Sequence, residues 1–312
     1  MNKLLMGACL TMAMQVGYSQ TLPQLGKDPI EKVVAAMTAE EKVSLLVGTG
    51  MPGFGGQSAV VGSTQNIVPG AAGTTFPIER LGIPAIVVAD GPAGLRISPT
   101  REGNEATYYC TAFPVATLLA STWNTALVKN VGNAMGDEVK EYGCDVLLAP
   151  ALNIHRSPLC GRNFEYYSED PFVTGKLAGA MVRGIQSNNV GATLKHFALN
   201  NKETNRKNSD SRVSERAARE IYLKAFEMIV KNNNPWAIMS SYNMINGYRA
   251  SESEDLLTGI LRDEWGYEGM VTTDWWTCGE HYKETKADKG AISRSEMETS
   301  VKRILGLILK LD

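Results

Sequence analysis

The 312-residue sequence has little of what marks a nucleic-acid-binding, metal-binding or membrane-spanning protein. Its 31 basic and 33 acidic residues are mixed along the chain and give a formal net charge of -2. This balance offers no basic surface for nucleic acid or an anionic membrane. The three histidines, His155, His196 and His281, lack helical spacing to one another, and the five cysteines form no CxxC pair. We therefore predict no metal site.

Long apolar runs are also missing. The apolar stretch near the N-terminus is too short to span a bilayer as an ordinary helix. Together with Lys3 and the small residues Gly17 and Ser19, it makes residues 1–20 typical of a secretory signal peptide. We expect an exported protein, periplasmic or secreted, with residues 21–312 as its mature domain. The disulfide connectivity of the cysteines that remain cannot be read from spacing, and isolated buried thiols are the simpler interpretation.

One glycine pattern resembles a nucleotide-binding loop but lacks its context. Residues 48–53 match GxGxxG, yet Pro52 and the glycines that follow prevent a helix from starting there. We therefore predict no dinucleotide cofactor, and no other cofactor. Residues 48–75 are expected to form a long glycine-rich loop.

From residue 84 onward, short apolar runs alternate with amphipathic stretches. The runs, read as strands, are 84–89, 113–120, 145–150, 190–194, 237–241 and 270–273, and helices are expected over 125–142, 171–186, 211–231 and 255–265. Helices are also expected over 28–37, 38–47 and 290–312, the last two starting with capping boxes at Thr38 and Ser293. This alternation predicts βα units and favours a TIM-type (β/α) barrel over an open sheet.

Polar side chains cluster where the apolar runs end. Asp90, Lys195, His196, Tyr242 and Asp274 are in these positions. In a barrel the carboxyl ends of the strands carry the active site, so these residues are expected around one mouth. The alternative is that strand ends are polar in any α/β protein.

Asp274 follows a strand-like run and precedes two tryptophans, Trp275 and Trp276. A carboxylate beside an indole face suits a sugar site, because the acid can react while the ring meets the apolar face of a pyranose. The structural alternative is that Asp274 caps the next helix or pairs with a buried arginine.

Five short motifs carry a family resemblance. In chain order they are Asp90-Gly91-Pro92-Ala93-Gly94-Leu95-Arg96, Gly161-Arg162-Asn163-Phe164-Glu165, Lys195-His196-Phe197, Ser241-Tyr242-Asn243 and Thr273-Asp274-Trp275. They occur in the order seen in family 3 of the glycoside hydrolases. The sequence resembles that family from about residue 38 to its end, and most closely its β-glucosidase branch.

The resemblance implies a retaining, exo-acting β-glucosidase that releases terminal β-linked glucose. Asp274 matches the nucleophile that forms a covalent glycosyl-enzyme, which water then cleaves. Asp90 matches the carboxylate that accepts hydrogen bonds from sugar hydroxyls; its structural alternative is a turn residue. Sugar specificity stays open, and a β-xylosidase is one alternative.

Further binding residues follow from the same resemblance. Arg162, Lys195 and His196 match donors to sugar hydroxyls, and Glu165 is expected to pair with Arg162. Arg156 and Arg206 are additional candidates. Tyr242 is expected to steady Asp274 through its hydroxyl, and Trp275 to offer a stacking face. For each of these residues the structural alternative is an ion pair or a buried hydrogen bond.

The sequence departs from the family in two places. A retaining glycosidase needs a second carboxyl group as acid/base, which relatives usually supply from a second α/β domain that is not seen here. Residues 284–290 also join the Asp274 region almost directly to the last helix, so we expect an internal deletion and a barrel incomplete by one βα element. An oligomer or partner domain would then complete the site. The alternatives are a sugar-binding or weakly active truncated barrel, and a remnant that does not fold alone.

Overall fold

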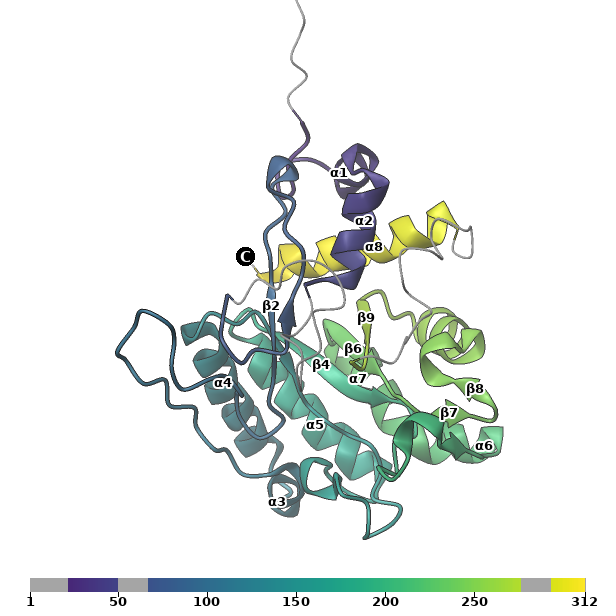
Figure 1. The fold of residues 1–312 in the computed structure, drawn as a ribbon. Coiled ribbons are helices and arrows are strands. Elements are labelled where there is room, and N and C mark those ends of the chain that lie inside the picture. The colour runs from purple at the N-terminus through teal and green to yellow at the C-terminus, as the bar shows by residue number, and fades with distance from the viewer. Residues whose placement is uncertain (1–21, 50–66, 276–292, 312) are drawn as a thin grey trace, which may run out of the picture.

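Five parallel strands form the centre of the protein in a computed structural model that describes residues 22–49, 67–275 and 293–311 (Figure 1). The strands are β1 Gly73–Thr74, β2 Val87–Asp90, β3 Val146–Leu148, β4 Gly191–Phe197, β5 Asp210–Ser211, β6 Ala237–Ser240, β7 Met244–Ile245, β8 Tyr248–Arg249 and β9 Met270–Thr273. The α-helices are α1 Ile30–Ala36, α2 Ala39–Val47, α3 Ala116–Ser121, α4 Thr125–Glu141, α5 Pro171–Gln186, α6 Glu215–Ala217, α7 Lys224–Asn233 and α8 Arg294–Leu311. Short 3-10 turns are η2 Glu79–Leu81, η3 Asn163–Glu165, η4 Arg206–Asn208 and η6 Ala250–Glu252, and π-helical segments are η5 Ala218–Tyr222 and η7 Asp255–Glu264.

The main sheet has the order β1-β2-β3-β4-β6-β9. Strand β1 runs antiparallel to β2, and every other neighbouring pair is parallel. Within the described ranges the sheet is open, with β1 and β9 at its edges. Alternating parallel strands and helices confirm the predicted TIM-type α/β fold in its incomplete form. A second, three-stranded sheet joins β5, β7 and β8.

Helices α4, α5 and α7 lie side by side along the sheet (Figure 1). Helix α5 is buried over most of its length because helices lie on both sides of it. It packs closely on α4 through small residues. A Cβ added to Gly184 would lie 2.2 Å from the Lys129 carbonyl oxygen, so only glycine fits at this crossing. This close packing holds β3 and β4, which adjoin these helices, in fixed relation.

A separate apolar cluster covers the amino-terminal ends of the strands. Helix α8 places Val301, Leu305 and Ile308 there, against α1 and α2. Val146, the first residue of β3, lies in the same cluster, and Met270, the first residue of β9, packs against it. Both predicted capping boxes are present, at Thr38 and at Ser293. The carboxyl ends of the strands are thus left for the site.

Two predictions of local structure were wrong. The apolar run 113–120 is not a strand, because it contains α3. Ala116, Leu119 and Ala120 are buried whereas Leu118 is 57% exposed, which is helical spacing. The single helix expected over 211–231 is instead β5, the capped turn of α6 after Ser214, the π-helical η5 and α7.

Several predictions concern residues outside the described ranges. These are the signal peptide over 1–20, the centre of the glycine-rich loop over 48–75, and the deletion expected at 284–290. Among the described residues, no helix has both the length and the apolar character needed to cross a membrane.

Candidate active site

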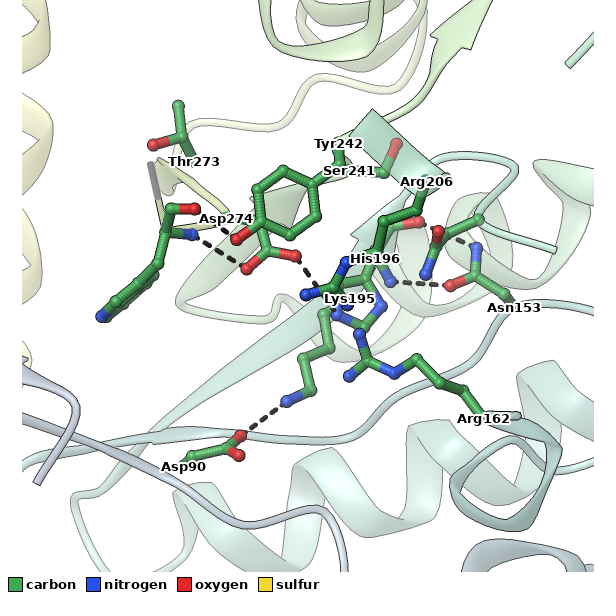
Figure 2. Close-up of polar contacts among 12 residues, drawn as sticks. Asp90, Asn153, Arg162, Lys195, His196, Arg206, Ser241, Tyr242, Thr273 and Asp274 are labelled. Carbon is green, nitrogen blue, oxygen red and sulfur yellow. Dashed lines mark hydrogen bonds and ion pairs between the residues drawn. The ribbon is translucent and has the colours of Figure 1, made fainter. Parts of the chain in front are cut away.

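A cavity of about 500 Å³ opens where the carboxyl ends of the parallel strands meet. It is lined by Gly70, Ala72, Asp90, Arg96, Leu148, Arg162, Phe164, Glu165, Lys195, His196, Arg206, Met239, Asp274 and Trp275. Residues from β2, β4 and the end of β9 therefore face one space although they are far apart in sequence. Figure 2 shows the polar residues that converge there.

Asp274 directly follows β9, and its backbone N–H donates to the Ser240 carbonyl oxygen at 3.2 Å. Its side chain is 15% exposed, and its Oδ1 accepts a 2.9 Å hydrogen bond from the Trp275 amide. Burial raises the pKa of Asp274 above its ordinary value of 3.8, although the Trp275 N–H and the nearby cations of Arg162, Arg206 and Lys195 oppose this shift. Its surroundings therefore make Asp274 a stronger base than an exposed aspartate.

His196 lies against Asp274, with Nε2 3.8 Å from Oδ2 (Figure 2). Burial, and then the charges of Arg162, Lys195 and Arg206, lower the pKa of His196 well below its ordinary value. The imidazole is therefore neutral and can act as a hydrogen-bond donor on one nitrogen and an acceptor on the other.

The backbone of His196 is held by one side-chain amide. Asn153 accepts a hydrogen bond from the His196 N–H at 2.9 Å and donates to the His196 carbonyl oxygen at 2.8 Å. The pairing of β4 with β6 shifts register between Leu194 and Phe197. Both Lys195 and His196 line the cavity, as expected for a strand that becomes irregular at its carboxyl end.

Lys195 and Asp90 form a tight ion pair on the β2 side of the cavity. The Lys195 Nζ lies 2.7 Å from the Asp90 Oδ1, and Arg96 Nη1 lies 3.2 Å from Oδ2. Burial would raise the pKa of Asp90, but Lys195 and then Arg96 and Arg162 outweigh it and lower that pKa. Asp90 therefore stays ionised, and its two oxygens are fixed in direction.

Two arginines are each paired with a glutamate. Arg162 Nε donates to Glu165 Oε1, which confirms the predicted pairing of these two residues. Arg206 Nη1 donates to Glu203 Oε2 at 2.8 Å, and its guanidinium lies 4.6 Å from the centre of the Tyr242 ring. Each carboxylate limits the positions that its guanidinium can take.

Tyr242 and Trp275 support the Asp274 loop in different ways. Tyr242 is buried, and its hydroxyl donates to the Trp275 carbonyl oxygen. Burial and the adjacent Asp274 raise the pKa of Tyr242. The Trp275 indole lines the cavity while its Nε1 donates to the Ala72 carbonyl oxygen at 2.9 Å. The indole is thus fixed in orientation beside the carboxylate.

Most of the predicted site residues are brought together. Asp90, Arg162, Lys195, His196, Arg206, Asp274, Trp275 and the supporting Glu165 all line the cavity. Tyr242 lies behind the lining, next to Asp274. Arg156 is exposed on the loop after β3 and is not part of the lining, so the structure does not bring it into the site.

Several residues of the site were not among the predicted ones, and three of them have polar or aromatic side chains. Arg96 and Phe164 line the cavity, and Asn153 holds His196. Arg96 and Phe164 lie inside two of the five motifs, so their place in the site could have been predicted from those motifs. Asn153 lies outside every motif, and only the fold shows its contact. In the described part of the chain, no group of three or more His, Cys, Asp or Glu residues is arranged to hold a metal ion.

Solved structures and characterised proteins resemble this chain. The structure of β-glucosidase 3B from Thermotoga neapolitana in complex with α-D-glucose matches with a TM-score of 0.84 and 47% identity, over 91% of this chain and 43% of that one. Beta-glucosidase A of Butyrivibrio fibrisolvens is 64% identical over 210 residues, which are 67% of this chain and 25% of that protein. An exo-α-(1→6)-L-arabinopyranosidase of Bifidobacterium longum is 49% identical over 202 residues, 64% of this chain and 27% of that protein.

This chain spans about a quarter of the length of these two characterised relatives. The model of the glycosyl hydrolase family 3 N terminal domain matches residues 63–293, which is more than half of the chain. The matched range contains every residue of the cavity described above. The chain therefore belongs to glycosyl hydrolase family 3, of which it carries the N-terminal, TIM-barrel-like domain.

Proposed function

We propose that this chain is the nucleophile-bearing barrel of a retaining, exo-acting β-glucosidase, with Asp274 as the nucleophile. The observation that carries the proposal is the position of Asp274: a largely buried carboxylate at the end of β9, beside neutral His196 and three cations, on the wall of a 500 Å³ cavity. Such a group can attack an anomeric carbon and form a glycosyl ester.

The other side of the cavity suits the sugar hydroxyls. Asp90 offers two fixed carboxylate oxygens, and Lys195, Arg96 and Arg162 supply donors around it. A vicinal diol can donate to both carboxylate oxygens at once. Trp275 presents an indole whose orientation its Nε1 hydrogen bond fixes, which suits the apolar face of a pyranose.

Glucose is the proposed sugar because two of the relatives named above are β-glucosidases. The arabinopyranosidase relative makes a pentopyranose the main competitor. A terminal pyranose fits an exo-acting site whose Asp90 wall binds the far hydroxyls. Export of the protein stays a prediction.

The described residues of the cavity do not supply a general acid. Asp90 and Glu165 line the cavity but are paired with Lys195 and Arg162, and neither is disposed to donate a proton. Retaining chemistry requires a second carboxyl group, and we infer that a group other than the described lining residues, such as one from another domain or a partner, supplies it. A leaving group that departs without protonation should bypass this requirement.

The test is therefore covalent trapping. The full chain is incubated with a 2-fluoro glucoside that carries a dinitrophenolate leaving group, and its intact mass is followed over time. The expected result is one fluoroglucosyl adduct, located on Asp274 by peptide mapping. Asp274→Asn should not label, whereas Asp263→Asn, an exposed acid of η7, should label like the wild type.

The second candidate function is sugar binding without hydrolysis, which the paired state of Asp90 and Glu165 favours. The same preparation separates the two candidates when glucose affinity is measured by calorimetry. An adduct on another residue would refute Asp274 as the nucleophile. No adduct in a folded chain that binds glucose would refute it too and leave sugar binding as the function.

A further inference from the structure

A chain of hydrogen bonds runs behind the cavity wall to His196, whose ring faces Asp274. Arg206 Nη1 donates to Glu203 at 2.8 Å, and Asn200 Nδ2 donates both to Glu203 at 2.9 Å and to the Tyr166 hydroxyl at 3.0 Å. The Tyr166 Oη lies 3.4 Å from the Nδ1 of His196. The Nε2 on the other side of that ring faces the Asp274 carboxylate at 3.8 Å.

The direction of these hydrogen bonds is set by Glu203. A carboxylate accepts only, so the amide of Asn200 must turn its NH₂ group toward Glu203. The same NH₂ group then donates to Tyr166, so the tyrosine oxygen is an acceptor on that side. The hydroxyl proton of Tyr166 must therefore point toward an acceptor other than the Asn200 side chain. Its two acceptors in reach are the His196 Nδ1 at 3.4 Å and the Asn200 carbonyl oxygen at 3.3 Å.

The charge of Asp274 decides between these acceptors. A neutral imidazole carries one proton, and Nε2 faces a carboxylate oxygen. A lone pair on Nε2 would repel that oxygen, whereas an N–H attracts it. The proton therefore belongs on Nε2, which leaves Nδ1 as an acceptor. Nδ1 is buried, and a buried acceptor without a donor is costly.

We propose that Tyr166 is a positioning residue that donates its hydroxyl proton to the Nδ1 of His196 and so aims Nε2–H at Asp274. Tyr166 is fully buried, so the hydroxyl is shielded from competing water. Its ring also lies edge-on to the imidazole, with centroids 6.4 Å apart. The effect on catalysis rests on the proposed role of Asp274, but the hydrogen bond to His196 does not.

The contact is tested by nitrogen NMR on the full chain labelled with ¹⁵N-histidine. The chain has three histidines, so substituting His155 and His281 in turn assigns the signals. In the wild type, His196 should show a protonated Nε2 and an unprotonated, hydrogen-bonded Nδ1. In Tyr166→Phe, the Nδ1 signal should move downfield to the position of a free acceptor. Tyr167→Phe is the matched control, because Tyr167 is also buried but lies in the apolar core.

A kinetic readout separates positioning from a merely structural role. In the trapping reaction, Tyr166→Phe should slow covalent bond formation about fivefold, the effect of one neutral hydrogen bond, with the affinity for the fluoroglucoside unchanged. A protonated Nδ1 in the wild type would overturn the proposal, and so would an unshifted Nδ1 in the folded variant. If the wild type does not label at all, the function of Asp274 fails while the NMR result still decides the role of Tyr166.

Discussion

The ion pair between Lys195 and Asp90 should be asymmetric, because its two partners are buried to different extents. The Nζ and Oδ1 atoms are 2.7 Å apart, with the Lys195 side chain 4% exposed and the Asp90 side chain 34% exposed. Asp90 also forms an ion pair with Arg96, whose Nη1 lies 3.2 Å from Oδ2, so it keeps a cationic partner when Lys195 is removed. Lys195 has no second anionic partner among its described ion pairs.

Asp90→Asn leaves a buried ammonium facing a neutral amide. Breaking a fully buried pair costs about 3–5 kcal/mol, and we expect about 2–3 kcal/mol here because water reaches the Asp90 side of the contact. Lys195→Met keeps the apolar stem of the side chain and leaves Asp90 paired with Arg96. Its cost should be about 0.5–1.5 kcal/mol, as for one lost contact at a partly solvated carboxylate.

Urea unfolding followed by circular dichroism measures both costs at pH 7. The folded-state pKa of Asp90 is below its ordinary value of 3.8, so its stabilisation is present above that value and is lost as the pH falls through the folded pKa. The effect of Asp90→Asn should therefore shrink in acid. Glu220→Gln, in the exposed Arg216–Glu220 pair, is the control and should change stability by about 0.5 kcal/mol or less.

Equal costs for Asp90→Asn and Lys195→Met would refute this reasoning, and a larger cost for Lys195→Met would do so more strongly. Either outcome would mean that the burial of Lys195 does not control the energy of the pair. The Asp90–Lys195 double variant completes the cycle, and its cost should be close to that of Lys195→Met alone.

Three further effects on stability are expected. Because burial raises the pKa of Asp274, Asp274→Asn should raise the melting temperature at pH 7, with a gain that fades as the pH falls through that pKa. Asn153→Ala removes both hydrogen bonds to the His196 backbone and should cost about 1–3 kcal/mol in urea unfolding. Leu305→Ala in α8 should cost about 2–5 kcal/mol since Leu305 is fully buried, whereas Leu309→Ala, at 37% exposure, should cost about 0.5 kcal/mol or less.

The parts of the fold that depend on neighbours in sequence could be predicted. Helix α5 has the expected bounds, because Asp170 caps it and Pro171 occupies its first turn. The capping boxes at Thr38 and Ser293 are equally local. The run 113–120 was misread because an apolar stretch of that length fits a strand or a buried helix, and only its packing distinguishes them.

The site could be predicted as a set of motifs but not as a set of contacts. Arg156 and Arg206 were equivalent candidates in sequence. In the fold, Arg206 is held at the cavity by Glu203 and the Tyr242 ring, whereas Arg156 is exposed. Asn153 contacts the main chain of His196, 43 residues away, and no local pattern reports such a contact. Long-range pairing therefore decides which polar loop residues belong to the site.

The environments of Asp90 and Asp274 shift the pKa values of these two carboxyl groups in opposite directions. Burial is the largest influence on both, but Lys195 touches Asp90 directly while it acts on Asp274 from farther away. Two carboxyl groups whose pKa values are shifted in opposite directions are typical of an active site in which the two groups have different roles. The two opposite pKa shifts match the proposed function, in which Asp90 binds the sugar hydroxyls and Asp274 is the nucleophile.

This arrangement predicts how the pH dependence of trapping should move. The labelling rate should fall in acid as Asp274 becomes protonated, so its acid limb reports the raised pKa of Asp274. Lys195→Met removes a cation that lowers this pKa, so the limb should move to higher pH. Asp90→Asn removes an anion beside Lys195 and should move it to lower pH. Shifts in the same direction in both variants would show that the acid limb belongs to another group, because one variant removes a positive charge and the other a negative one.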